Sequence, residues 1–412
     1  MIFRKMWGVF SLAFANKIFL SNSFRSFNNL ILTRAQTTFQ TRLCAHYIIS
    51  QEETDRATSQ LSLCSEVSID MEFDRDHYAY GTTLCLIQAN GNGKTYIFDI
   101  LSGINMNKFY IDILENSSIL KIMHSPSEDI RIIQSKGCYP VSIYDTEKSA
   151  KLLDFQYTSL GTIVKEILNI SLDKSEQKSN WIKRPLTNTQ IEYASLDVLY
   201  LSELKNNLNK LANEKGIYEW INEENLAWNQ YRSSEKNESN FVSKKDAEKL
   251  SPYEVFCYNE LLKIRDKYSK LLNKPGHHVI PKQILYYYSM TKNIHESIIL
   301  RNRNEVHPAL RKSSVEKEFN SALKNAQIEA TQLNLAKKFV TYKKDTSEEL
   351  VIMSSDYPRL FKSLSDKYGK HAANYILPNR LIADLATNRI NLNDVPFTYK
   401  KKLFLEILNK LA

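Results

Sequence analysis

Two acidic residues, Asp70 and Glu72, stand two positions apart within Val67–Phe73, whose other residues are typical of a buried strand. Residues at i and i+2 of a strand project from the same face of a sheet, so both carboxylates point the same way. Two like charges on a core strand are costly unless something neutralises them. Carboxylate oxygens suit Mg²⁺ or Mn²⁺, so this pair could hold a divalent metal ion. The alternative is an edge strand whose two acids face water.

A second acidic feature follows the predicted strand Leu120–His124, where the sequence Ser-Pro-Ser-Glu-Asp opens a predicted helix at 126–136. Functional side chains of α/β folds are commonly placed where a strand ends and a helix begins. Taken alone, Glu128 and Asp129 fit better as acids that the dipole of the first helical turn favours.

A third feature is the pair Tyr193 and Asp197 on the predicted helix 188–213. The i, i+4 spacing places both side chains on one face of the helix, which is otherwise apolar. An acid on such a face needs a partner, and a simple Tyr–Asp hydrogen bond would also provide one.

The elements that must position these residues are three strands followed by alternating helices and strands. This order predicts a mixed sheet with helices on both faces. The predicted strands are Val67–Phe73, Thr83–Ala89, Thr95–Ile100, Leu120–His124 and Ser142–Tyr144, with a turn at 90–93 that makes the first three an antiparallel meander. The predicted helices are 47–64 with Ser50 as N-cap, 107–116, 126–136, Thr146–Asp154, 158–169 and 188–213.

Composition describes a globular chain of several domains rather than a strongly basic nucleic-acid binder. The residues are 43% hydrophobic and 25% charged, as in an ordinary globular protein. The length of 412 residues is too great for one ordinary core. The formal charge is +9, but the first 50 residues hold six basic residues and no acid, so the remainder is only mildly basic. Charge alone therefore does not establish nucleic-acid binding.

The five cysteines are widely spaced and include no Cys-x-x-Cys pair, so neither a zinc site nor a disulfide framework is indicated. A reducing compartment is the simple inference. The acid-free, Arg- and Ser-rich segment 1–46 fits a mitochondrial presequence or an extension outside the folded enzyme. We expect a cytoplasmic protein, or a mitochondrial matrix protein if residues 1–46 are a presequence. The longest apolar run of this segment, Trp7–Ala15, is too short to span a bilayer, so no membrane partner is expected.

The three acidic features occur in a familiar order. Ile-Asp-Met-Glu-Phe at 69–73, His-Ser-Pro-Ser-Glu-Asp at 124–129 and Tyr-Ala-Ser-Leu-Asp at 193–197 closely resemble the motifs of the DEDD family of 3′→5′ exonucleases, in the subgroup with Tyr in the last motif. Within it the chain is most similar to the ribonuclease D group. The stretch Gln177–Leu186 is similar to the group's segment before the last motif, and 251–313 resembles an HRDC domain.

The resemblance implies a fold of class α/β, with a ribonuclease H-like mixed-sheet exonuclease domain followed by all-α HRDC-type helical domains. We expect the chain to be divided into a 1–46 extension, a 47–231 exonuclease domain, a 232–250 linker, a 251–313 HRDC domain and a 325–412 HRDC-like domain.

The resemblance also implies chemistry with two divalent metal ions, Mg²⁺ or Mn²⁺, and no small-molecule cofactor. If the family's motif residues keep their roles in this chain, the metal ligands are Asp70, Glu72, Asp129 and Asp197, and Tyr193 positions the attacking water. A tyrosine is neutral at pH 7, so it is better suited to orient the water by a hydrogen bond than to remove a proton from it.

Four residues are candidates for binding substrate, each with a plainer alternative. Phe73 could belong to the core, His124 could be a hydrogen-bonded histidine at a strand end, and Gln177 and Arg184 could be solvated surface. A charged cluster of Asp74, Asp76 and His77 departs from the commoner ribonuclease D run. Asp145 is expected to be a helix N-cap, and the basic residues of the 251–313 unit could hold RNA backbone.

The implied activity is hydrolytic trimming of RNA single-stranded 3′ tails, as in tRNA precursors, with release of nucleoside 5′-monophosphates. The alternatives are a DNA 3′→5′ repair exonuclease of the same superfamily and a non-catalytic RNA-binding protein that keeps the fold. A helicase is disfavoured because the sequence contains no Gly-x-x-x-x-Gly-Lys-Ser/Thr loop.

Overall fold

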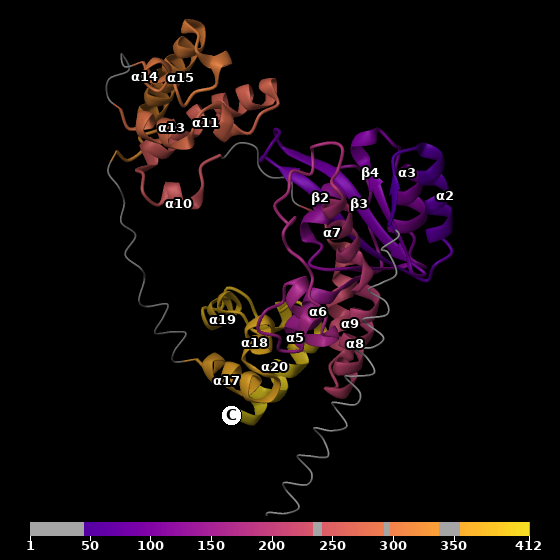
Figure 1. Cartoon of the computed structure of the whole chain (residues 1–412). Helices are drawn as coiled ribbons and strands as arrows, with labels where there is room; N and C mark the ends of the chain where they lie inside the picture. The colour runs from indigo at the N-terminus through magenta and orange to yellow at the C-terminus, as the bar shows by residue number, and fades with distance from the viewer. Residues whose placement is uncertain (1–44, 234–240, 292–296, 338–354, 412) are drawn as a thin grey trace, which may run out of the picture. The chain divides into compact units, whose positions relative to one another are not determined.

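A six-stranded mixed sheet is the framework of the N-terminal half (Figure 1). The computed structural model describes residues 45–233, 241–291, 297–337 and 355–411, so most of the 1–46 extension lies outside the described residues. The strand order is β1-β4-β3-β2-β5-β6. The strands are β1 (Ala45–Ile48), β2 (Glu66–Arg75), β3 (Thr82–Gly91), β4 (Lys94–Asp99), β5 (Leu120–Met123) and β6 (Ile143–Asp145).

The central strand β2 joins the antiparallel and parallel halves of the sheet. It pairs antiparallel with β3, which pairs antiparallel with β4, and this confirms the predicted meander. On its other side β2 runs parallel to β5, and β5 runs parallel to β6. The register of β2 and β3 shifts between Glu72 and Phe73, a β-bulge beside the two acids.

The side chains of β2 alternate between two different environments. Val67, Ile69 and Met71 are buried in an apolar cluster together with residues of helices on one face of the sheet. The intervening positions, Ser68, Asp70 and Glu72, therefore project from the opposite face. The pattern of 67–73 thus decides which face of the sheet carries the acids.

The helices of this half differ from the predicted ones in several places, including the unpredicted helix α9 and the division of the predicted helix 107–116 into α3 and η2. Helix α2 begins at Gln51 under a Ser50 cap that accepts from the Glu53 amide, so the predicted start at 47 is wrong because Ala45–Ile48 forms β1. The predicted helix 188–213 is divided at Tyr200. The elements are α2 (Gln51–Leu61), η1 (Ile100–Ser102), α3 (Asn107–Phe109), η2 (Tyr110–Leu114), α4 (Ser127–Gln134), α5 (Thr146–Leu152), α6 (Leu160–Leu168), α7 (Asn188–Leu199), α8 (Leu201–Glu214), α9 (Tyr218–Leu226) and η3 (Ala227–Gln230).

The described part of 241–337 is helical and has its own apolar cluster, which includes Leu261, Leu285, Phe319 and Ala326. Its longest helices are α11, capped by a Ser251–Glu254 capping box, and α15, which runs through the predicted boundary at residue 325. The elements are α10 (Lys244–Ala247), α11 (Pro252–Leu272), α12 (Gly276–Val279), α13 (Lys282–Ser289), α14 (Ile298–Arg301), η4 (Pro308–Leu310) and α15 (Ser313–Gln332).

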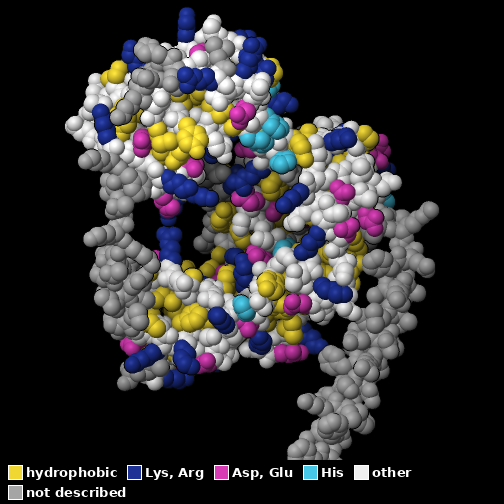
Figure 2. All heavy atoms as spheres, turned by 60° about the vertical axis from the view of Figure 1, so that its left-hand side comes forward, with side chains coloured by type: hydrophobic (Ala, Val, Ile, Leu, Met, Phe, Trp, Pro, Cys, Tyr) yellow, Lys and Arg dark blue, Asp and Glu magenta, His cyan; other side chains and the backbone are white. Residues whose placement is uncertain are grey.

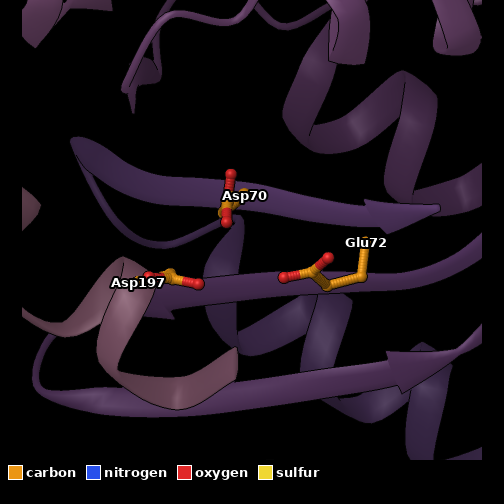
Figure 3. Close-up of side chains that lie close together, drawn as sticks. All are labelled: Asp70, Glu72 and Asp197. Carbon is orange, nitrogen blue, oxygen red and sulfur yellow. The ribbon is translucent and has the colours of Figure 1, made fainter. Parts of the chain in front are cut away.

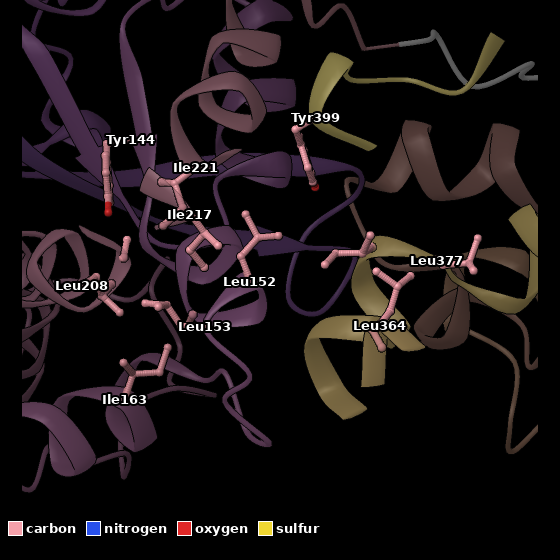
Figure 4. Packing of buried hydrophobic residues seen from close by; sticks show 14 of the residues in the cluster. Tyr144, Leu152, Leu153, Ile163, Leu208, Ile217, Ile221, Leu364, Leu377 and Tyr399 are labelled. Carbon is pink, nitrogen blue, oxygen red and sulfur yellow. The ribbon is translucent and has the colours of Figure 1, made fainter. Parts of the chain in front are cut away.

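The C-terminal helices share one apolar core with helices of the sheet-bearing half of the chain. Leu364, Leu377 and Phe404 belong to the same buried cluster as Leu153 and Leu208, and Figure 4 shows part of this packing. Each fully buried side chain of this size contributes about 2 kcal/mol relative to exposure. The elements are α17 (Tyr357–Tyr368), α18 (Lys370–Ile376), α19 (Asn379–Ala386), η5 (Leu392–Asp394) and α20 (Thr398–Leu411).

Three global properties of the described ranges bear on the sequence predictions. None of their helices is long and apolar enough to cross a membrane. The four cysteines within them are all free, as the spacing predicts. Figure 2 shows Lys and Arg side chains interspersed with Asp and Glu over the face in view, which agrees with the mild net charge of the chain after residue 50.

Candidate active site

Three carboxylates from two elements meet above the centre of the sheet. One carboxylate oxygen each of Asp70, Glu72 and Asp197 lies within 4.8 Å of the other two. Figure 3 shows that Asp197 reaches this place from helix α7 and that its carboxylate points toward that of Glu72. All three side chains are partly buried. The packing of α7 on the sheet thus brings together Glu72 and Asp197, which are 125 positions apart in the sequence.

The position of Asp197 follows from how α7 begins and packs. Thr187 and Gln190 form a capping box that fixes the first turn of the helix. The Gln190 side chain also donates to the Ser179 hydroxyl at 2.6 Å, which ties the helix to the preceding loop. Ala194 and Val198, which are fully buried, anchor the helix, and Asp197 is left beside the acids of β2.

Asp129 is the fourth acid, and it comes from the first turn of helix α4. It is 7% exposed, and its pKa is raised well above the usual value, first by burial and then by the negative charge of Asp70. Asp129 therefore belongs electrostatically to the same group, although it lies outside the set of three whose oxygens are mutually within 4.8 Å.

Burial and mutual repulsion make the ionised state of this group costly. Burial raises the pKa of Asp70 to about 7, against a backbone hydrogen bond at Met71 that lowers it. Burial and the charge of Asp70 raise the pKa of Asp197 to about 8. The pKa of Glu72 is raised well above its usual value by burial and by Asp70, Asp197 and Asp129. Four carboxylates in one place need added positive charge to ionise together.

The donor set fits hard divalent cations. It consists of carboxylate oxygens, which suit Mg²⁺ and Mn²⁺ better than softer metals. The three acids of the 4.8 Å set are close enough to share one ion, and Asp129 adds a fourth carboxylate nearby. Bound cations would offset the burial that raises these pKa values, together with the repulsion that adds to it at Glu72, Asp129 and Asp197.

Tyr193 lies one helical turn before Asp197 and is hydrogen-bonded to it. Its pKa is raised, first by burial and then by the charges of Asp197, Glu72 and Asp70. The phenol therefore keeps its proton at neutral pH and acts as a hydrogen-bond donor. Its ring lies 6.0 Å from that of Trp181, which is 3% exposed and packed.

The predicted substrate residues lie in four different settings. Phe73 is partly buried and packs against the apolar cluster on one face of the sheet. His124 lies 2.8 Å from the Thr146 hydroxyl through Nδ1, and burial lowers its pKa to about 4, so the ring is neutral. Gln177 is exposed in a turn before α7. A role of these residues in substrate binding stays a prediction.

The fourth predicted substrate residue, Arg184, has strong internal partners. Its Nε and Nη2 donate to the two carboxylate oxygens of Asp99, and its Nη1 donates to the Trp181 carbonyl at 2.6 Å. Asp99 also accepts a hydrogen bond from Tyr47 of β1. The guanidinium thus ties the loop before α7 to the end of β4 and to the edge strand.

Two acids near the site have structural partners. Asp145 is the N-cap of α5, as predicted, and accepts from the Glu147 amide at 2.9 Å and from the Ser125 amide at 3.0 Å. Glu128 forms an ion pair with Arg75 and another with Arg131, each at 2.9 Å. These contacts separate Glu128 from its neighbour Asp129, which faces the acidic group.

The charged cluster at the end of β2 shapes the loop that follows the strand. Asp74 is 5% exposed and accepts hydrogen bonds from the Tyr78 and Ala79 amides at 3.1 Å each. Asp76 accepts from the Gly81 amide at 2.6 Å. Asp74 and Asp76 therefore fix the conformation of the loop that joins β2 to β3.

The basic stretch of the helical unit is largely engaged within that unit. Lys263 pairs with Glu260 and Lys267 pairs with Glu318, each at 2.6 Å. Arg265 donates to the Gly276 carbonyl at 2.9 Å. These contacts reduce the charge that the helix offers to a polyanion, and RNA binding by this face stays a prediction.

The sequence analysis did not single out Gln88, which the structure places beside the acids. Gln88 of β3 is paired directly with Asp70 of β2 and is 0% exposed. The one feature of the sequence that could have identified Gln88 is that it is a single amide within the apolar run Leu84–Ala89.

Comparison with known proteins agrees with this geometry. Residues 45–213 match the family model described as 3′-5′ exonuclease. The chain is 30% identical over 225 residues to ribonuclease D of Pseudomonas paraeruginosa, and 32% identical over 246 residues to ribonuclease D of Desulfotalea psychrophila. These matches cover 53% and 58% of this chain, and 58% and 64% of the relatives, so the chain spans less than two thirds of their length.

A solved structure has the same fold. Ribonuclease D of Escherichia coli, described as an exoribonuclease involved in structured RNA processing, aligns with a TM-score of 0.63 at 21% identity. The alignment covers 89% of this chain and 98% of that one. The similarity therefore extends from the mixed sheet into the helical C-terminal region.

Proposed function

We propose that the chain is a metal-dependent 3′→5′ exoribonuclease, because residues 45–213 match the 3′-5′ exonuclease model and the two relatives at 30% and 32% identity are named ribonuclease D. It trims single-stranded 3′ ends of RNA, such as those of tRNA precursors, and releases nucleoside 5′-monophosphates. The observation that carries the proposal is the convergence of Asp70, Glu72 and Asp197 within 4.8 Å.

The acids would hold two divalent cations. Asp70, Glu72 and Asp197 would supply carboxylate oxygens, and Asp129 would complete the donor set from α4. When bound, such cations activate water as the nucleophile and stabilise the charge on the attacking and leaving oxygens of an in-line displacement. Water adds to the last phosphorus, the bond to the preceding 3′ oxygen breaks, and that oxygen takes a proton.

Tyr193 orients the attacking water through its hydroxyl. The raised pKa keeps the phenol protonated, so it can donate a hydrogen bond but cannot serve as the base at neutral pH. Its hydrogen bond to Asp197 ties its hydroxyl to the acidic group. Positioning of this kind lowers the barrier by holding the reacting atoms in line.

The names of the relatives support RNA over DNA as the substrate. Both curated relatives described above are named ribonuclease D, and the similar solved protein is described as acting on structured RNA. A protein distinguishes RNA from DNA by contacts to the 2′-hydroxyl. We further propose that the helical unit with its own core, predicted at 251–313, and the C-terminal helices, predicted at 325–412, are HRDC-type domains that help to hold the RNA.

The test uses the full chain and matched RNA and DNA hairpins with identical 3′ tails, labelled at the 5′ end. We expect stepwise shortening of the RNA in Mg²⁺ or Mn²⁺, release of nucleoside 5′-monophosphates, and none of either in EDTA. A 3′-phosphate should block the reaction, and Asp70→Asn should abolish it. Faster digestion of DNA would favour the repair exonuclease, and metal-independent binding without cleavage would favour a non-catalytic RNA-binding protein.

A further inference from the structure

Gln88 lies beside the acidic group, and its buried amide has no hydrogen-bond partner within the part of the chain that the structure describes. Its side chain is 0% exposed, and neither its Nε2 nor its Oε1 has a hydrogen-bond partner among the residues that the structure describes. Buried polar groups in folded proteins are nearly always hydrogen-bonded, and each exception needs a reason. An unpaired amide is costly because it loses its bonds to water and gains none in return.

The register of the sheet places this amide next to Asp70. Gln88 and Asp70 are direct partners across the antiparallel pair β2–β3, so their side chains share one face with Cβ atoms about 5 Å apart. Helix α7 contacts β2, β3 and β4 on this face, since it brings Asp197 over the acids of β2. The Gln88 amide is therefore fully buried on the sheet face that α7 covers.

A second amide on the same strand, that of Asn90, has a hydrogen-bond partner within the sheet. Asn90 stands two residues later on the same face and is 9% exposed, and its Nδ2 donates to the Thr95 hydroxyl at 2.7 Å. The residue opposite Gln88 on β4 is Ile97, which is fully buried and offers no side-chain polar atom. An apolar side chain at position 88 would match this neighbour without leaving an amide unpaired.

We propose that Gln88 is a positioning residue whose Nε2 donates to the Asp70 carboxylate when the acidic group is ionised around divalent cations. This inference rests on the proposed function. A neutral donor suits the role, because it fixes the orientation of Asp70 without adding a positive charge that would compete with the cations. Groups that hydrogen-bond to metal-ligating carboxylates orient them and tune metal affinity.

The chemistry of this role predicts opposite effects on stability and on metal binding. Gln88→Met keeps the length of the side chain and removes both unpaired polar atoms. The metal-free protein should then unfold at the same or a higher temperature, whereas Mn²⁺ affinity should fall. A residue needed only for packing would show the reverse.

The test measures Mn²⁺ affinity by electron paramagnetic resonance and metal-free Tm by calorimetry, using the full chain and no nucleic acid. We expect Gln88→Met to raise the Mn²⁺ Kd about tenfold or more without lowering the metal-free Tm. Asn90→Leu is the matched control: loss of its bond to Thr95 should lower Tm and leave Kd unchanged. Gln88→Leu serves as a second variant of the same kind.

A wild-type Mn²⁺ Kd in both Gln88 variants would overturn the inference about Gln88. The same result would leave the proposed metal site unaffected. A lowered metal-free Tm with an unchanged Kd would also overturn the inference, because it would make Gln88 a packing residue. If the wild-type protein and Asp70→Asn both fail to bind Mn²⁺, the proposed function fails instead.

Discussion

The guanidinium of Arg184 is bound to the carboxylate of Asp99 by two hydrogen bonds, Nε to Oδ2 at 2.5 Å and Nη2 to Oδ1 at 2.6 Å. The Asp99 side chain is 4% exposed and that of Arg184 is 24% exposed. A bidentate pair of this kind is among the stronger protein hydrogen-bonding arrangements. It connects the loop before α7 to β4, and so it helps to hold the helix that carries Tyr193 and Asp197.

Arg184→Ala should lower the free energy of unfolding by about 3 kcal/mol, because it leaves the buried Asp99 without its cation. Denaturant unfolding monitored by circular dichroism measures this directly. Lys183→Ala, at the exposed neighbouring position, is the control and should change stability by less than about 0.5 kcal/mol. Equal stability of the two variants would show that the Arg184–Asp99 pair contributes nothing to the fold.

The metal-free protein should lose stability as pH rises from about 4 to 8. The pKa of Asp70 is raised to about 7 and that of Asp197 to about 8, both mainly by burial, whereas an unfolded aspartate titrates near 3.9. In this window the folded state binds more protons than the unfolded state, so the free energy of unfolding falls with rising pH. Saturating Mg²⁺ or Mn²⁺ should remove the fall, since it stabilises the ionised acids.

Thermal unfolding at several pH values, with EDTA or with metal, measures this dependence. Asp197→Asn should raise the stability of the metal-free protein at pH 8 by at least about 1 kcal/mol, because one unit of pKa shift corresponds to about that energy. A metal-free protein that grows more stable from pH 4 to 8 would contradict the assignment of these acids.

Tyr193→Phe should reduce the rate of RNA digestion by about a hundredfold and leave Mn²⁺ affinity near that of wild type. The change removes only the hydroxyl that is hydrogen-bonded to Asp197. Ser195→Ala is a matched control on the same helix, because the Ser195 hydroxyl donates to the Ile191 carbonyl at 2.6 Å and does not face the acids. Comparable losses of activity in the two variants would point to a general effect on α7 rather than a role of the phenol.

Glu224→Ala should weaken the contact between the C-terminal helices and the sheet-bearing half and lower the free energy of unfolding by about 3–5 kcal/mol. Glu224 of α9 accepts hydrogen bonds from Tyr399 at 2.8 Å and Tyr375 at 3.0 Å, and it forms an ion pair with Lys400 at 3.3 Å. Glu219→Ala, an exposed position on the same helix, should have little effect. Chemical unfolding of both variants provides the comparison, and equal stability would show that the contact is dispensable.

Local pattern was sufficient to predict the acid-bearing elements. Alternation within Val67–Phe73 identifies the strand and places Asp70 and Glu72 on one face, and the i, i+4 spacing does the same for Tyr193 and Asp197. Strand β1 was missed because four residues show too little alternation, and its pairing with β4 is a tertiary effect. The break at Tyr200 was missed because apolar spacing continues into Leu201.

The partners of single side chains could not be predicted from sequence. Arg184 and Asp99 are 85 positions apart, and nothing local to Arg184 distinguishes an internal ion pair from a phosphate contact. Gln88 was overlooked for a related reason. One amide in an apolar strand has no periodicity, and its relation to Asp70 depends on the register of two strands.

The most direct measurement is the single-turnover rate at which the full chain shortens a 3′-tailed RNA in Mg²⁺, compared with Asp197→Asn. The two proteins should have the same circular dichroism spectrum, so that any difference in rate reflects the site. We predict that wild type releases nucleoside 5′-monophosphates stepwise from the 3′ end and that Asp197→Asn is slower by at least about a hundredfold. A wild-type rate in Asp197→Asn would contradict the account.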